Sequence, residues 1–132
     1  MPESLVSETD IKQNAELLNK IQQVFSQVKS LEIMIPDSND VQNYLLHYPD
    51  VIDLIVPICK LVRGKFKHPT QISLEIYHDP EIFDEYITVY VRQDSYDKNI
   101  MNKIEEIEKK YEKELINKNG WIIVTTDFKQ PR

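Results

Sequence analysis

Residues 78–85, HDPEIFDE, hold the densest set of chemically active side chains in this sequence, with four carboxylates and a histidine beside a proline. Carboxylates gathered in one loop can bind a hard cation such as Mg²⁺ or Ca²⁺. The calcium-loop pattern requires a central glycine and acids at fixed offsets, and this segment has neither. Asp-Pro starts turns readily, and carboxylates keep a turn hydrated. We therefore predict a polar hairpin turn here and no metal ligands.

Other residues that could form a catalytic site do not fall into a catalytic pattern. The three histidines, His47, His68 and His78, lie on separate segments and form no H-x-x-H pair. The single cysteine, Cys59, sits in the apolar stretch IVPICKLV, where burial makes a thiol inert. The presence of only two glycines argues against a nucleotide-binding loop. We expect no catalytic residue and no cofactor.

Two alternatives to this interpretation stay open. A metal-assisted hydrolase or nuclease would use the acids of loop 78–85 together with Glu75 and Asp127. Against it, the strand after the loop reads TVYVR and lacks the E-x-K arrangement common in nucleases. The other alternative is a small-ligand pocket between the predicted sheet and the helix that contains Pro57.

Length and charge limit the classes further. The 132 residues suit a single domain spanning 1–132, with 41% hydrophobic and 29% charged residues. The formal charge is −6 and the basic cluster at 60–67 is short, so we expect no nucleic-acid partner. The apolar run 51–62 is too short to cross a bilayer, which predicts no membrane contact. One cysteine and an N-terminus unlike a signal peptide predict a cytoplasmic protein.

The elements that would position these residues follow from hydrophobic periodicity. Apolar residues recur at helical spacing in four stretches, near 8–30, 39–47, 49–64 and 97–118. Strict alternation predicts two strands, 72–77 and 86–92, which the polar loop joins as an antiparallel hairpin. The chain therefore begins with helices and continues as β-β-α-β.

The remaining segments complete an α+β fold. WIIVTTDF, 121–128, is apolar on both alternations and predicts a third strand buried on both faces. A crossover through the last helix would be right-handed and would let this strand pair with 72–77, leaving 72–77 central. Residues 31–35 either end the first helix or add a fourth edge strand, and the tail 129–132 should fray. We predict a two-layer sandwich with a small mixed three-stranded sheet.

One face of this sheet is the candidate binding surface. If the aliphatic alternates of the hairpin face the helices, the opposite face carries tyrosines and an arginine, which are enriched in binding hot spots. The same composition also suits strands in general, and the long N-terminal helix could cover the face. The predicted partner-binding residues are Glu75, Tyr77, Tyr86, Tyr90 and Arg92.

The C-terminal half, from LEIYHDPEIFDEYITVYVRQDSYD to GWIIVTTDF, resembles a family of small uncharacterised bacterial proteins, many of them cyanobacterial. The resemblance spans roughly residues 45–128. It implies a bacterial, cytosolic origin and carries over no activity and no catalytic residues.

These observations favour a non-enzymatic protein-interaction module. The acidic charge suits an antitoxin-like protein or an accessory subunit that binds another protein, and a homodimer would use the same surface.

Overall fold

The computed structural model describes residues 8–82 and 84–132. Within them the chain forms α1 (Glu8–Ser30), α2 (Ser38–His47), α3 (Ile52–Lys65), β1 (Gln71–His78), β2 (Glu85–Arg92), α4 (Ile100–Leu115) and β3 (Ile122–Thr125), with a 3-10 turn at Pro49–Val51. The predicted α+β fold, with helices first and then β-β-α-β, is confirmed.

The sheet is mixed, with the strand order β1-β2-β3. β1 runs antiparallel to β2, and β3 runs parallel to β2. The prediction that the third strand pairs with the first was therefore wrong, and β2 is the central strand. The reason is that the outer edge of β1 is already occupied: Met34 donates its N–H to the Ile72 carbonyl and accepts from the Leu74 N–H, at 2.9 and 2.8 Å. The free side of β2 is then the place left for β3.

The predicted fourth strand at 31–35 is reduced to a single bridge. Met34 pairs in parallel with Ser73, and no longer ladder is present in the part of the chain that the structure describes. Helix α1 ends at Ser30, and Glu32 has a φ of 59°. This left-handed residue turns the chain from the helix axis to the sheet edge after two residues, which leaves little length for a strand.

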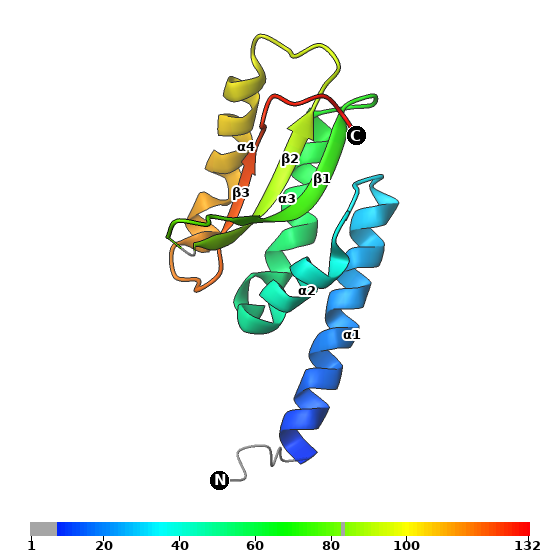
Figure 1. The fold of residues 1–132 in the computed structure, drawn as a ribbon, viewed down its shortest axis with the longest axis vertical. Coiled ribbons are helices and arrows are strands. Elements are labelled where there is room, and N and C mark those ends of the chain that lie inside the picture. Colours follow the sequence, from blue (N-terminus) through cyan, green and yellow to red (C-terminus); the bar gives the residue numbers. More distant parts are fainter. Residues whose placement is uncertain (1–7, 83) are drawn as a thin grey trace.

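The core lies between the sheet and the helices. Helices α3 and α4 pack on one side of the sheet, with α1 and α2 beyond them towards one end (Figure 1). The strand residues on this side are all buried, and they are Ile72, Leu74, Ile76, Ile87, Val89, Val91, Ile122 and Val124. This is the predicted two-layer arrangement.

The prediction that the third strand is buried on both faces was wrong. In β3, Ile122 and Val124 are buried, whereas Ile123 and Thr125 are partly exposed. The cause is position: β3 is an edge strand, and the helices cover only one of its faces.

Helix α1 is longer than the body that it packs against. Its buried side chains, Ile21, Val24, Phe25 and Val28, lie in the C-terminal half, which contacts α2 and α3. The N-terminal half projects beyond the body, and Ile11 is 58% exposed (Figure 1). Helix α1 therefore leaves the face of the sheet opposite α3 and α4 uncovered.

The turn that leads into β3 is anchored to the helical layer through Gly120. The Asp50 carboxylate accepts hydrogen bonds from the N–H groups of Asn119 and Gly120, at 2.6 and 3.2 Å. A Cβ at Gly120 would stand 2.8 Å from a Val51 methyl and 3.0 Å from the Tyr48 Cβ. Only a hydrogen fits at this position without a shift of the buried Val51.

We expect Gly120→Ala to lower the free energy of unfolding by about 1–3 kcal/mol, because the added methyl overpacks a buried contact. The measurement is urea unfolding followed by circular dichroism. Gly64→Ala is the matched control: a Cβ there meets nothing within 4 Å, and the site lies inside α3. Alanine is the better helix former, so the control should raise stability by roughly 0.5–1 kcal/mol. Equal stability of the two variants would contradict the crowding at Gly120.

Candidate functional site

The predicted face of the hairpin is present as one surface. The antiparallel register sets Tyr77 opposite Tyr86, and Glu75 opposite Thr88. The rings of Tyr77 and Tyr86 stack with centroids 5.0 Å apart, and Tyr77 is 37% exposed. We call Tyr77, Tyr86 and Tyr90, which share this side of the sheet, the tyrosine face. Rigid, partly exposed aromatic rings give contact area at low entropic cost.

Arg92 lies on the same face of the sheet, but its side chain is not accessible to a binding partner. Its side chain is 1% exposed and lies over the Tyr90 ring, 4.6 Å from the centroid. The guanidinium donates to Asp127 at 2.9 Å and to Glu75 at 3.1 Å. Burial on its own would lower the pKa of Arg92, but the hydrogen bonds to the two carboxylates outweigh it and raise the pKa. Arg92 is thus a structural residue between two acids.

The C-terminal segment, 126–132, covers this end of the face. Residues 126–128 were predicted to continue the third strand, and 129–132 were predicted to fray. Gln71 and Arg132 exchange hydrogen bonds at 2.8 and 3.0 Å, and Tyr96 donates its hydroxyl to the Lys129 carbonyl. The segment crosses the sheet from the end of β3 towards β1 (Figure 1). It closes the face over Arg92 and leaves open the opposite end, where the Tyr77–Tyr86 pair lies.

Between these ends, Thr88 holds a buried hydroxyl without a hydrogen-bond partner among the residues that the structure describes. In the register Thr88 lies between Glu75 on β1 and Ile123 on β3. The Glu75 carboxylate is not a partner for Thr88. It accepts hydrogen bonds from the Ser73 hydroxyl, at 2.7 Å, and from Arg92. Thr88 and Ser73, at the centre of the tyrosine face, are both buried.

A second feature, an apolar groove beside β3, was not predicted as a site. It has a volume of about 420 Å³ and lies between α4 and β3. Trp121 and Ile116 line it and are 44% and 69% exposed. The sequence does contain a signal, because Ile116 falls outside the buried helical stripe that ends at Leu115. The groove also depends on the pairing of β3 with β2, whereas the sequence analysis paired this strand with 72–77.

The acidic loop forms a hairpin turn, as predicted. Asp79 donates its N–H to the Asp84 carbonyl at 2.8 Å, and its carboxylate accepts from the Glu81 N–H at 2.9 Å. Among the described residues, no three histidine, cysteine or acidic side chains are grouped closely enough to hold a metal ion. Glu75 and Asp127, which a metal-assisted hydrolase would need, both bind Arg92 instead.

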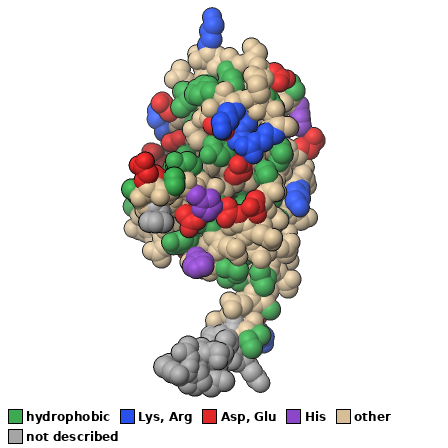
Figure 2. Space-filling model, viewed as in Figure 1, with side chains coloured by type: hydrophobic (Ala, Val, Ile, Leu, Met, Phe, Trp, Pro, Cys, Tyr) green, Lys and Arg blue, Asp and Glu red, His purple; other side chains and the backbone are tan. Residues whose placement is uncertain are grey.

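His78 ties this hairpin to α2. Its Nε2 lies 2.7 Å from an Asp40 carboxylate oxygen, and its Nδ1 lies 2.6 Å from one of Glu85. Figure 2 shows histidine side chains set among acidic ones in the middle of this view of the molecule. The hydrogen bond that the His78 ring donates to the Asp40 carboxylate raises the pKa of His78 in the folded protein, against a smaller opposing effect of burial.

The contribution of His78 to stability should depend on pH. A raised pKa in the folded state stabilises the protein fully below the unfolded value, about 6.5, and the effect is lost as pH rises through the folded value. We expect His78→Gln to cost less than about 1 kcal/mol at pH 5.5, because the pair is half exposed, and nothing at pH 9. Urea unfolding of both proteins at the two pH values measures this. A cost that grew with pH would contradict it.

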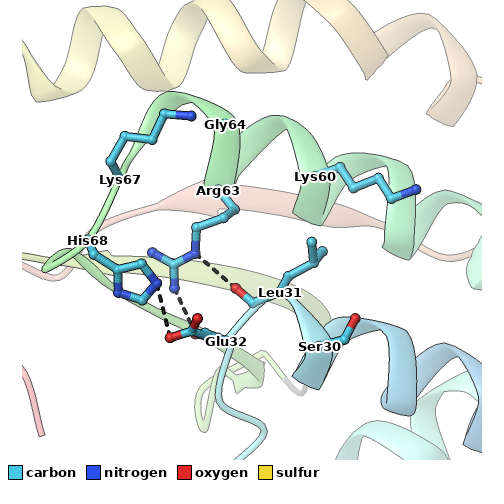
Figure 3. Close-up of a pocket in the computed structure, with 8 residues that line it drawn as sticks. All are labelled: Ser30, Leu31, Glu32, Lys60, Arg63, Gly64, Lys67 and His68. Carbon is cyan, nitrogen blue, oxygen red and sulfur yellow. Dashed lines mark hydrogen bonds and ion pairs between the residues drawn. The ribbon is translucent and has the colours of Figure 1, made fainter.

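A hollow of about 600 Å³ with basic residues at its rim lies at the C-terminal ends of α1 and α3. Figure 3 shows the Arg63 guanidinium turned towards residues 31 and 32, whereas Lys60 and Lys67 point away from it. Arg63 donates to the carbonyls of Leu31 and Glu32 at 3.0 and 2.7 Å. Helix C-termini carry negative partial charge. Arg63 therefore has a structural role, because its donors are taken up by backbone carbonyls. The helix C-termini around the hollow do not favour binding of an anion.

The remaining candidates belong to the core or to other parts of the fold. Cys59 is fully buried, as predicted, and burial raises the pKa of its thiol to about 12. The hollow beside Pro57 is lined by α1 and α3 and does not involve the sheet. In the described ranges, none of the helices has the length and hydropathy needed to cross a membrane.

The sequence matches no family model, and no curated protein and no solved structure is significantly similar to it. The resemblance to a bacterial family therefore stays a prediction, and functional inference depends on the geometry of this chain.

Proposed function

We propose that this chain is a non-enzymatic protein-interaction module that binds a partner protein through the tyrosine face. The observation that supports the proposal is the stacked Tyr77–Tyr86 pair on a sheet face that the helices leave uncovered. Interfaces concentrate their binding energy in such aromatic residues, especially where neighbouring polar groups are already paired. Arg92, Glu75 and Asp127 satisfy one another next to the tyrosines, so docking there would strand no charge.

The partner that suits this chain is a different, basic protein. The formal charge of −6 speeds encounter with a basic surface and opposes encounter between two copies. An antitoxin-like protein or an accessory subunit would have this character. The homodimer is the competing outcome of the experiment below.

The test compares two tyrosines that are alike in exposure but lie on different surfaces. Tyr77 and Tyr48 are each 37% exposed, and each packs on another tyrosine ring, at 5.0 and 4.7 Å. Tyr48 lies beside α2, away from the tyrosine face. The partner captured by the tagged wild-type chain from its source cells would be purified, and its affinity measured for Tyr77→Ser and Tyr48→Ser.

We expect Tyr77→Ser to weaken binding at least tenfold, which corresponds to about 1.4 kcal/mol, and Tyr48→Ser to leave it unchanged. Equal effects of the two variants would overturn the assignment of the face. Light scattering that shows the wild type as a stable dimer, with Tyr77→Ser monomeric, would replace the heterologous partner with a second copy.

A further inference from the structure

The apolar groove between α4 and β3 has the size and the walls of a small-ligand site. Tyr111, Leu115 and Ile122 line it with buried side chains, and Trp121 and Ile116 line it with side chains that are 44% and 69% exposed. Its volume of about 420 Å³ lies within the range of roughly 300–1,000 Å³ that ligand pockets occupy. Such pockets join apolar walls to a few polar groups, and these polar groups decide which ligand fits.

The aromatic wall of the groove is held by backbone hydrogen bonds. The Trp121 N–H donates to the Tyr44 hydroxyl at 3.0 Å, and the Trp121 carbonyl accepts from the Ile87 N–H at 3.0 Å. The preceding residue, Gly120, donates its N–H to the Asp50 carboxylate. The indole ring therefore projects from a fixed backbone, and a ligand that binds there does not have to order this segment.

The polar side chains of the groove are mainly acidic. Glu108 and Glu112 lie one turn apart on α4 and both line the groove, which Lys113 also borders. None of the ion pairs between described residues includes Glu108 or Glu112. Glu108 is partly buried, and burial, followed by repulsion from Glu105 and Glu112, raises its pKa. A positive charge placed beside these two carboxylates would relieve their repulsion.

The end of α4 adds negative potential at the same place. The part of α4 that lines the groove begins at Glu108 and includes the last residue, Leu115, and the C-cap residue, Ile116. The last carbonyls of a helix lack intrahelical partners, and together they act as roughly half a negative charge. Two carboxylates and a helix C-terminus therefore outweigh the single ammonium of Lys113.

These charges distinguish between kinds of occupant. A neutral apolar molecule would cover Glu108 and Glu112 without a counter-ion, which costs free energy. An anion would be repelled, and a second copy seated on the groove would bring the same acids together. A cation with an apolar body would neutralise the carboxylates and would also lie against the Trp121 indole, whose face attracts positive charge.

We infer that the groove binds a small organic cation, with an apolar or aromatic body against Trp121 and Ile116 and an ammonium or amidinium group at Glu108 and Glu112. This inference goes beyond the proposed function and does not depend on it. The groove borders β3, whereas Tyr77 lies on β1, at the other side of the sheet. The two sites can therefore be tested separately.

The test uses the fluorescence of Trp121, which is the only tryptophan in the chain and so reports on the groove. The probes are phenylbutylammonium, phenylbutanol and phenylbutanoate, which share an apolar body and differ in charge. At pH 7 we expect the ammonium to give a saturable change with a Kd at least tenfold below that of the alcohol, and the carboxylate to give none. Equal affinities for the ammonium and the alcohol, or no saturable response to the ammonium at millimolar concentration, would overturn the inference.

The double variant Glu108→Gln, Glu112→Gln isolates the charge of the groove. It should lower the affinity for the ammonium to that for the alcohol and leave the affinity for the alcohol unchanged. Glu105→Gln, Glu114→Gln removes the same charge from α4 at positions that do not line the groove, and should change the affinity by less than about threefold. If this control weakened the ammonium as much as the double variant does, net charge and not the groove would explain the attraction, and the inference would fail.

Ile116→Ser tests the apolar wall. It should weaken the ammonium and the alcohol alike, by about threefold or more, because both lose the same apolar contact. Met101→Ser, an exposed position in the first turn of α4, and Tyr77→Ser, on the tyrosine face, should bind both probes as wild type does. A wild-type dimer in light scattering, with Trp121 emission that changes with protein concentration, would assign the groove to a second copy and overturn the small cation.

Discussion

Arg92→Ala is expected to lower the free energy of unfolding by about 3–5 kcal/mol, the largest loss among the substitutions that we consider. The guanidinium is 1% exposed and is the shared partner of Glu75 and Asp127, which are 20% and 22% exposed. Removing it takes from Glu75 and Asp127 the cation that they share, and leaves Glu75 with only a 4.0 Å ion pair to Arg132. It also releases Asp127, and with it the segment that closes this end of the sheet. Urea unfolding at pH 7 measures the loss.

The control removes all three charges together. Replacing a buried ionic cluster with neutral residues of similar volume is often neutral in stability, whereas breaking it is not. The variant Arg92→Met, Glu75→Gln, Asp127→Asn should therefore recover most of the loss. If the triple variant were as unstable as Arg92→Ala, the loss would come from the hydrogen bonds of the Arg92 guanidinium and not from the unpaired charges of Glu75 and Asp127.

The pH dependence of the same comparison follows from Asp127. Its pKa is lowered chiefly by the hydrogen bond from Arg92. A carboxyl with a depressed folded pKa contributes stability that is present above its unfolded value, about 3.9, and is lost as pH falls through the folded one. We therefore expect the difference between wild type and Arg92→Ala to shrink below about pH 4. A difference that stayed constant to pH 2 would contradict an ionic origin.

Arg92 also shows what could be predicted from the sequence and what could not. Alternation with a period of two correctly assigned Tyr77, Tyr86 and Arg92 to one side of the sheet, because side-chain direction in a strand is a local property. Burial of Arg92 is not local. It depends on Asp127, which is 35 residues away in the chain and lies beyond the end of β3, although the sequence analysis placed it in the predicted strand 121–128.

The position of β3 was unpredictable for a similar reason. Its hydrophobic pattern is strong, but a pattern does not say which side of a hairpin a returning strand joins. The pairing of Met34 with β1 decided this, and Met34 lies two residues after the turn at Leu31–Glu32, in a segment too short to be assigned from sequence. Because Met34 occupies the outer edge of β1, β3 pairs with the free side of β2 and becomes the other edge strand, beside the apolar groove.

Arg63→Ala is the second substitution with a large expected effect, a loss of about 3 kcal/mol in the free energy of unfolding. Arg63 donates to four carbonyls, those of Leu31, Glu32, Phe66 and Thr70. These belong to the ends of α1 and α3 and to the loop before β1, so one side chain holds three segments. Hydrogen bonds from a charged donor are worth about 1.5–3 kcal/mol, and the part-buried carbonyls left without a donor add to the loss.

Arg63→Lys sharpens this prediction, because it keeps the charge and removes the forked geometry. The lysine ammonium has three donors on a flexible stem. It cannot reach all four carbonyls that surround the planar guanidinium of Arg63. The lysine variant should therefore recover less than half of the loss, as measured by urea unfolding. Lys60→Ala, on the exposed side of the same hollow, is the control and should change stability by less than about 0.5 kcal/mol. If Arg63→Lys were as stable as wild type, positive charge near the helix C-terminus, and not recognition of the carbonyls, would explain the arginine.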